Sequence, residues 1–238
     1  MGFADRSDRE RALVQIGRVI DRLVREGTAV ARSDGSVHTL FPVAVSAAEA
    51  EALQGWIIRE GAVHTIEVGL GYAISALFVC AGLCTNDDST ARHVVIDPNQ
   101  TTRFANCGLQ FLEEAGVSEL VEFYAEESQI VLPRFVSDRR RFDFAFVDGN
   151  HRFDGVFLDL VYLGRLLRPG GIVRLVACFP LKEPTFRALH LTADILDFVP
   201  GKISRHSLLS ALFFGVGHSG LLVRLTWHIA MCHLFSMS

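Results

Sequence analysis

The segment that decides the fold spans residues 66–75 and has the sequence IEVGLGYAIS. An apolar strand ends at Val68, glycines follow at Gly69 and Gly71, and an apolar helix begins near Ala73. A glycine-rich turn between a strand and a helix lets a ligand approach the backbone and the helix N-terminus. Taken alone, this turn is equally compatible with a ligand site and with a tight turn that binds nothing.

Two acidic residues indicate the kind of ligand. A dinucleotide site has the pattern G-x-G-x-x-G, and Ile74 stands at its third glycine. Glu67 precedes the first glycine by two residues, where a carboxylate would repel a pyrophosphate but attract an ammonium group. Asp97 ends the next predicted strand, where an acid either accepts hydrogen bonds from ribose hydroxyls or simply begins a turn before Pro98. The pattern favours a cationic nucleoside and disfavours a nicotinamide-dependent dehydrogenase.

Strands and helices alternate on both sides of this turn. Apolar runs predict strands over 64–68, 93–96, 120–124, 142–147 and 172–176, with helices over 73–82, 104–114 and 153–167 and a turn over 168–171. Near-continuous apolar strands separated by helices are typical of a parallel sheet that is covered on both faces. The expected fold is therefore α/β, with a doubly wound, mostly parallel sheet.

The first sixty residues are predicted to form an N-terminal helical extension. Apolar residues at helical spacing predict a helix over 5–26, and a loop or short strand follows over 28–42. Ser46 and Glu49 have the spacing of a capping box, which predicts a second helix to about Glu60. We expect an extension over 1–60 and an α/β domain over 61–238.

Composition excludes several classes of protein. The chain has 238 residues, 50% of them hydrophobic, and a net charge of −4, which excludes disorder over most of its length and argues against a nucleic-acid binder. Its five cysteines show no CxxC spacing, so they predict neither a disulfide framework nor a zinc knuckle. Charged residues near the start argue against a signal peptide, and glycines interrupt the uncharged run over 207–223. We expect a cytoplasmic protein with no membrane span.

With these residues placed, the chain resembles the class I S-adenosylmethionine-dependent methyltransferases. It is most similar to the small-molecule O-methyltransferase-like group, whose fourth strand ends in Asp-Gly-x-His. The resemblance covers about residues 53–171 and rests on five motifs in order: residues 67–71, Asp97, Glu127-Ser128 ahead of Leu132-Pro133, residues 142–151, and residues 166–171. It implies a Rossmann-like methyltransferase fold.

The resemblance also implies a cofactor and the residues that bind it. The cofactor would be S-adenosylmethionine, with Asp97 at the ribose and the acid-Ser pair beside the adenine. The expected cofactor-binding residues are Glu67, Gly69, Gly71, Tyr72, Ser75, Asp97, Glu127, Ser128 and Asp148.

Methyl transfer is an in-line displacement, so the protein chiefly aligns the nucleophile with the methyl carbon. An oxygen nucleophile must also lose its proton to a base or be masked by a metal. His151 is the expected catalytic base because its unperturbed pKa lies near neutrality, although it could instead cap the following helix or orient Asp148. Asp148 could be a base, a metal ligand or a structural acceptor. Asp154 and Asp159 are expected to be solvated or to lie at the helix N-terminus, and the other histidines show no ligand spacing.

The segment after residue 171 departs from the family pattern. Relatives with a metal site carry an acidic pair near the positions of Val176 and Ala177, and both acids are absent here. With only Asp148 left, a hard divalent cation would lack most of its oxygen ligands, so no bound metal is expected. Arg174 interrupts a predicted buried strand and must find a carboxylate, reach solvent or deform the strand.

Two functions from different classes fit these observations. The first is an enzyme that transfers a methyl group from S-adenosylmethionine to a small-molecule acceptor, at oxygen. The alternative is a catalytically impaired methyltransferase-like module that keeps the nucleoside site and binds a partner. Asp148 and His151 favour the enzyme, whereas the missing acids favour the module. The first helix can pack on its own domain or on a second copy, so a homodimer is one of the arrangements considered.

Overall fold

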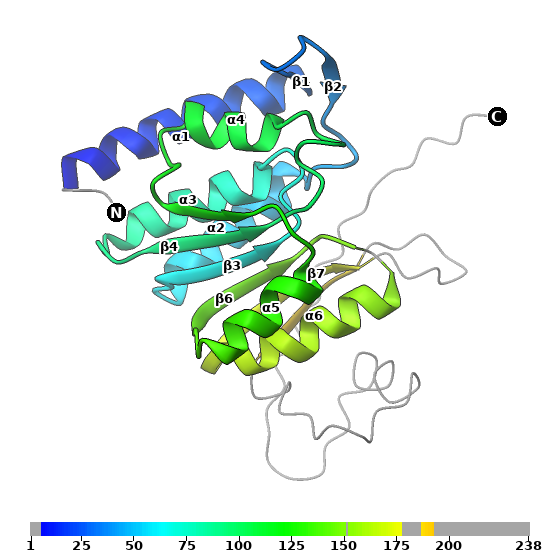
Figure 1. Ribbon diagram of the computed structural model, residues 1–238. Coiled ribbons are helices and arrows are strands. Elements are labelled where there is room, and N and C mark those ends of the chain that lie inside the picture. The colour runs from blue at the N-terminus through cyan, green and yellow to red at the C-terminus, as the bar shows by residue number, and fades with distance from the viewer. Residues whose placement is uncertain (1–5, 151, 178–186, 193–238) are drawn as a thin grey trace.

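The computed structural model describes residues 6–150, 152–177 and 187–192. Helices and strands alternate along most of the chain (Figure 1). The elements in chain order are α1 (Arg6–Glu26), β1 (Thr28–Val30), β2 (Val37–Thr39), α2 (Ala47–Arg59), β3 (His64–Val68), α3 (Ile74–Asn86), β4 (Arg92–Ile96), α4 (Cys107–Glu114), β5 (Val121–Tyr124), α5 (Ser128–Ser137), β6 (Phe142–Val147), α6 (Phe153–Leu166), β7 (Leu167–Ala177) and β8 (Arg187–Thr192).

The main sheet confirms the predicted doubly wound architecture. Its strand order is β5-β4-β3-β6-β7-β8, in which the first five strands are parallel and β8 is antiparallel to β7. The chain builds outward from β3 to β5 and then returns to the other side of β3 with β6. The order therefore reverses between β3 and β6, and the carboxyl ends of these two strands are where such sheets bind ligands.

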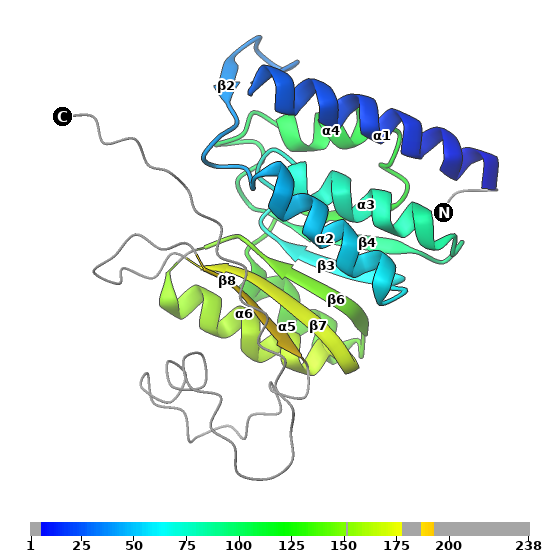
Figure 2. The ribbon, with the colours of Figure 1, turned by 180° about the vertical axis from the view of Figure 1, so that it is seen from behind.

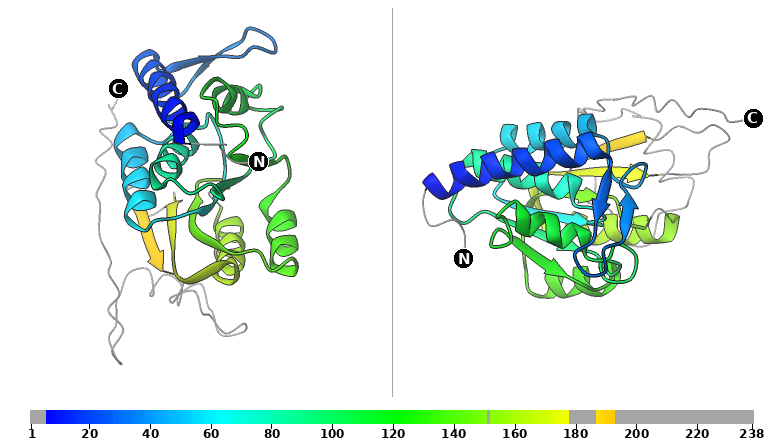
Figure 3. Two further views of the ribbon diagram at one scale, coloured as in Figure 1. Left: turned by 90° about the vertical axis from the view of Figure 1, so that its left-hand side faces the viewer. Right: turned by 90° about the horizontal axis from the view of Figure 1, so that it is seen from above.

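Helices cover both faces of the sheet, as Figures 1 and 2 show: α1 to α4 lie on one side, and α5 and α6 lie on the other. Side chains alternate along each strand, so Val95 joins the core beneath α3, while Val94 and Ile96 join the core beneath α5 and α6. Ile16 of α1 belongs to the same core as Leu77 of α3. The N-terminal helix is therefore packed on the sheet domain, where it contacts α3 and α4 (Figure 3).

Local signals in the first half of the chain are largely confirmed. Ser46 caps α2, its side chain accepting from Glu49 N at 3.3 Å while the Glu49 carboxylate accepts from Ser46 N at 3.0 Å. The predicted end of the third helix at Gly82 is wrong, because α3 continues to Asn86. A Cβ on Gly82 would lie 2.8 Å from Ile57 Cγ2, so this glycine serves close packing between α2 and α3 instead of ending the helix.

Two elements of the second half differ from the prediction. Helix α5 was not predicted, because a proline inside a segment argues against a helix and Pro133 stands within the apolar spacing of Val131, Leu132 and Phe135. The turn predicted over 168–171 lies within β7. Leu167 pairs with Phe142 and Ile172 with Phe144, so the extra residues form an irregularity in a ladder that continues on both sides.

Among the residues that the structure describes, no helix is long and apolar enough to cross a bilayer.

Candidate functional site

The glycine turn lies at the carboxyl end of β3, against the residue that follows β6. Gly69 has a φ of +96°, and a Cβ placed on it would lie 2.4 Å from the Asp148 carbonyl oxygen. Gly71 has a φ of +52°, but a Cβ there would meet nothing within 4 Å. Gly69 is therefore required by the packing of the protein itself, whereas Gly71 borders open space that a ligand can enter.

Asp97 holds this turn in place from the end of β4. Its Oδ2 accepts from Leu70 N at 3.1 Å and Gly71 N at 3.0 Å, and its Oδ1 accepts from Asn99 N at 2.7 Å. The side chain is only 3% exposed. The structure thus brings Asp97 to the turn, where its hydrogen bonds hold two backbone amides beside the open space at Gly71. Its expected contact with a ribose stays a prediction.

Gln100 is a site residue that the sequence analysis missed. It is 2% exposed, and its Nε2 donates to Gly71 O at 2.8 Å and to Asp97 Oδ2 at 2.9 Å. It therefore links the turn to the acid that supports it. In the sequence, Gln100 could have been found by its position three residues after Asp97, in the same turn.

Glu67 lies on the face of the sheet that α3 covers, and it is fully buried. One carboxylate oxygen accepts a hydrogen bond from the Ser75 hydroxyl, and the other lies 2.9 Å from His93 Nε2. Two of the predicted residues, Glu67 and Ser75, therefore contact each other. His93 joins them, although its sequence position suggested no role.

Tyr72 packs between the turn and the N-terminal extension. It is 6% exposed, and its ring stands edge-on to Phe104, with the centroids 5.1 Å apart. The ring of His38, from β2, lies 6.0 Å from it on another side. The small β1–β2 hairpin is thereby placed beside the glycine turn.

Asp148 follows β6 and closes the site next to the glycine turn. Its backbone N donates to Val68 O at 2.9 Å. Burial, followed by the negative charges of Glu67 and Glu49, raises the pKa of Asp148 to about 8. His151, the other predicted catalytic residue, lies outside the described residues.

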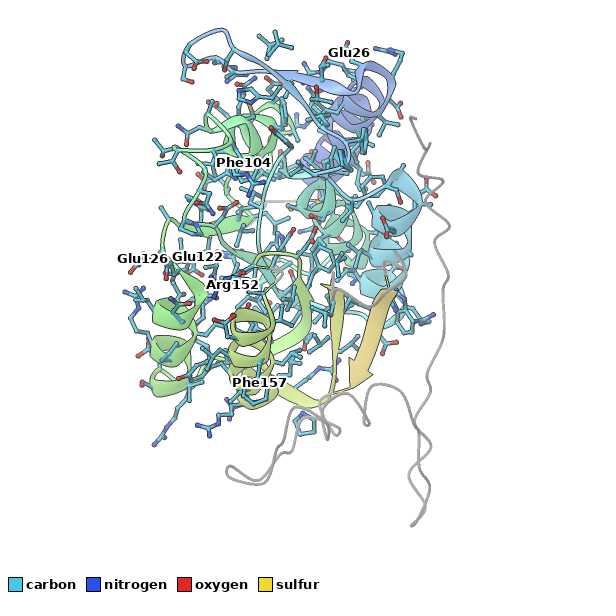
Figure 4. The ribbon with its side chains drawn as sticks, turned by 90° about the vertical axis from the view of Figure 1, so that its right-hand side faces the viewer. Glu26, Phe104, Glu122, Glu126, Arg152 and Phe157 are labelled. Carbon is cyan, nitrogen blue, oxygen red and sulfur yellow. The ribbon has the colours of Figure 1, made fainter. Side chains whose placement is uncertain are left out.

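Three loops surround this end of the sheet. Figure 4 labels one residue from each of them: Phe104 after β4, Glu126 after β5 and Arg152 after β6. Glu127 is exposed at the N-cap of α5, and Ser128, the first residue of that helix, is half-buried. The predicted residues of the third motif therefore follow β5 on the same edge as Asp97 and Asp148.

The predicted solvation of Asp159 is wrong. This α6 residue is only 1% exposed, and neither of its carboxylate oxygens has a hydrogen-bond partner among the described residues. Burial raises the pKa of Asp159 to about 6, and the nearby Ser128 hydroxyl offsets part of that rise. Helical spacing places residue 159 on the face that carries Val156 and Leu163, so it is buried with them. Asp154, by contrast, is exposed as expected.

We expect Asp159→Asn to stabilise the protein at pH 8 by about 2 kcal/mol, because the folded state no longer holds a buried charge. Because the pKa of Asp159 is higher in the folded state, its protonated form contributes to the stability of the fold fully below the unfolded value of 3.8. That contribution is lost as the pH rises through about 6. The gain should therefore vanish near pH 4. Urea unfolding at the two pH values measures it, with Asp154→Asn on the same helix as the control; equal gains at both pH values would contradict the assignment.

Arg174 takes none of the three outcomes predicted for it. It is 8% exposed, it pairs in register with Phe146 of β6 and His190 of β8, and it has no carboxylate partner among the described residues. Its guanidinium carbon instead lies 5.4 Å from the centre of the Trp56 ring, a cation–π contact. Burial and the charge of Arg59 lower the pKa of Arg174.

A metal centre has no counterpart in the part of the chain that the structure describes, where no three His, Cys, Asp or Glu side chains are grouped to hold an ion.

Comparisons with known proteins agree with this architecture. Residues 66–175 match the sequence model of a family described as a methyltransferase domain. No curated protein matches the chain. The predicted resemblance to methyltransferases is thus confirmed for the segment that carries the glycine turn, Asp97 and Asp148. The Asp-Gly-x-His subgroup stays a prediction.

Solved structures show the same fold. An O-methyltransferase from Bacillus cereus, in complex with SAH, has a TM-score of 0.50 at 18% identity over 69% of this chain and 65% of its own. The O-methyltransferase TomG from Streptomyces achromogenes, involved in tomaymycin synthesis and in complex with SAM, has a TM-score of 0.50 at 25% identity over 69% of this chain and 64% of its own. The chain thus covers less than two thirds of either protein.

Proposed function

We propose that this chain, whose residues 66–175 match a methyltransferase domain, transfers a methyl group from S-adenosylmethionine to an oxygen of a small-molecule acceptor. The observation that carries the proposal is the combination, at the point where the strand order reverses, of open backbone at Gly71 with a concentration of buried carboxylates. The complexes of the two O-methyltransferases above with SAH and SAM support it.

The charge of the site fits a cationic cofactor. The carboxylates of Glu67 and Glu49 both raise the pKa of Asp148, so the site already carries a negative potential. A ligand with a positive sulfonium and an ammonium group would be attracted there, whereas a pyrophosphate would be repelled. This favours S-adenosylmethionine over a dinucleotide on physical grounds.

The proposed binding residues divide into two groups. Glu67, Gly69 and Ser75 would act by shaping the turn, since Glu67 and Ser75 hold each other and Gly69 packs on Asp148. The others would face the ligand: Gly71 and Tyr72 at the turn, Asp97 at the ribose, Glu127 and Ser128 beside the adenine, and Asp148 near the sulfonium.

S-adenosylmethionine supplies a methyl group already activated by a sulfonium leaving group. The protein's part is to align the acceptor and to remove its proton. We assign the removal of that proton to His151, which follows Asp148 by three residues in the sequence. With a pKa of about 8, Asp148 is largely protonated at neutral pH before ligands bind, so it is the poorer base. His151→Ala should abolish turnover and leave cofactor binding intact.

Calorimetric titration with S-adenosylhomocysteine tests the proposed cofactor. We expect binding that magnesium does not change, and at least a ~100-fold loss of affinity in Asp97→Ala, because that variant releases the amides of Leu70 and Gly71. Asp88→Ala is the matched control, since Asp88 also accepts from a backbone amide, at Thr90, but before β4 instead of after it. A folded wild-type protein that binds neither S-adenosylhomocysteine nor S-adenosylmethionine would exclude the function.

The alternative, a catalytically impaired module, is favoured by the lack of acids at Val176 and Ala177. An acceptor screen with hydroxylated aromatic compounds separates the two: cofactor binding without methylation of any acceptor would support the module. The proposal further includes a cytoplasmic location. It also includes a small-molecule acceptor instead of nucleic acid, in keeping with the net charge of −4. The extension over residues 1–60 would contact the site through the β1–β2 hairpin. Light scattering distinguishes the homodimer considered above from a monomer.

A further inference from the structure

A chain of buried polar side chains runs beneath the glycine turn, across the two central strands β3 and β4. Thr65 and His93 are direct partners in the parallel register, and Glu67 lies two residues further along β3 on the same face. All three are at most 1% exposed. His93 Nδ1 lies 2.9 Å from Thr65 Oγ1, and His93 Nε2 lies 2.9 Å from Glu67 Oε2.

The distances indicate where the protons of this chain lie. Thr65 has one hydroxyl proton and two acceptors within reach, His93 Nδ1 at 2.9 Å and the Arg92 carbonyl at 3.4 Å. The Glu67 carboxylate can only accept, so His93 Nε2 carries a proton and donates to it, while Thr65 Oγ1 holds the other ring nitrogen at the shorter of its two contacts.

Glu67 consequently receives two hydrogen bonds at full burial, from His93 and from the Ser75 hydroxyl. A buried carboxylate is costly unless donors satisfy it, so both donors stabilise the Glu67 carboxylate in this position. The negative charge of Glu67 acts on the carboxyl ends of β3 and β6, where we propose that the ligand binds, since it is one of the groups that raise the pKa of Asp148 there.

We propose that His93 is a positioning residue that holds the buried Glu67 carboxylate in place beneath the glycine turn, and that it thereby gives the cofactor site its preference for a positively charged ligand. This role rests on the proposed function, because it concerns the same site. His93 touches no ligand in this scheme and acts only through Glu67.

The test compares two ligands that differ in charge at one atom. S-adenosylmethionine carries a sulfonium, and S-adenosylhomocysteine carries a neutral thioether. At pH 6, below the pKa of Asp148, we expect His93→Leu to weaken S-adenosylmethionine binding about 10-fold and S-adenosylhomocysteine binding by less than about threefold, because one charge interaction of roughly 1.4 kcal/mol is lost. His93→Gln should restore the preference, since its amide can donate from near the place of Nε2. Equal weakening of both ligands, or a glutamine variant that behaves like the leucine variant, would overturn the proposal.

A second readout does not depend on the cofactor. Carbon-13 NMR titration of the Asp148 carboxyl in the ligand-free protein should show a lower pKa in His93→Leu than in wild type, because the Glu67 carboxylate is no longer held where it raises that pKa. An unchanged Asp148 pKa would refute the role of His93. If wild type binds neither ligand, the proposed function fails while this titration still decides the inference. If His93→Leu does not fold, Thr65→Val removes the partner of Nδ1 and should shift both readouts in the same direction.

Discussion

Gly69→Ala is expected to destabilise the ligand-free protein by about 4 kcal/mol, the largest effect of any substitution in the glycine turn. Two costs combine at this position. A φ of +96° is disfavoured for every residue with a Cβ, and that Cβ would stand 2.4 Å from the Asp148 carbonyl oxygen and 2.7 Å from Gly149 Cα. Because both neighbours are backbone atoms, relief requires β3 and the residues after β6 to separate. Urea unfolding measures the loss.

Gly71→Ala is the matched control two residues away. Gly71 also has a positive φ, but a Cβ there would meet nothing within 4 Å. We therefore expect the variant to lose about 1 kcal/mol of free energy of unfolding, from the backbone conformation alone. Its binding of S-adenosylhomocysteine should nevertheless fall, because the new methyl group occupies the open space that we assign to the ligand. Equal destabilisation by the two variants would contradict the distinction between a packing glycine and a ligand-facing one.

The second large effect is expected at Asp148, whose pKa is raised to about 8. The folded state prefers the protonated carboxyl, so its contribution to stability is fully present below the unfolded value of 3.8 and is lost as the pH rises through about 8. Asp148→Asn removes that loss. We expect the variant to exceed wild type in free energy of unfolding by about 3 kcal/mol at pH 9 and by little at pH 4.

Ligand binding should respond to the same ionisation in the opposite sense. Deprotonation of Asp148 adds a negative charge to the site, so the affinity of wild type for S-adenosylmethionine, taken relative to that of Asp148→Asn, should rise between pH 6 and pH 9; the ratio removes the titration of the ligand's own amino group, which both proteins share. Thermal unfolding and calorimetry at matched pH values measure the two effects. A variant whose stability and affinity follow the wild-type pH profile would show that Asp148 does not titrate there.

Much of the site could be located from the sequence because its parts follow consecutive strands. The glycine turn, Asp97 and Asp148 each come directly after a predicted apolar run, and Glu127 comes within three residues of one. The carboxyl ends of parallel strands meet at one edge. Their neighbours could not be found in this way. Gln100, His93 and Asp159 lie at positions where sequence spacing predicts either a loop or an ordinary buried or solvated residue.

The alternation of apolar runs and helices determined by itself that this chain would form a doubly wound sheet, and the capping box at Ser46 determined where α2 begins. The ligand site after the first central strand stays a prediction. These features are local, since propensity and side-chain periodicity act within a few residues. Only the tertiary structure decided that His93 stands opposite Thr65 and reaches Glu67, and that Gly69 is pressed against Asp148. Such contacts depend on strand register and on the packing of distant segments, which local periodicity does not specify.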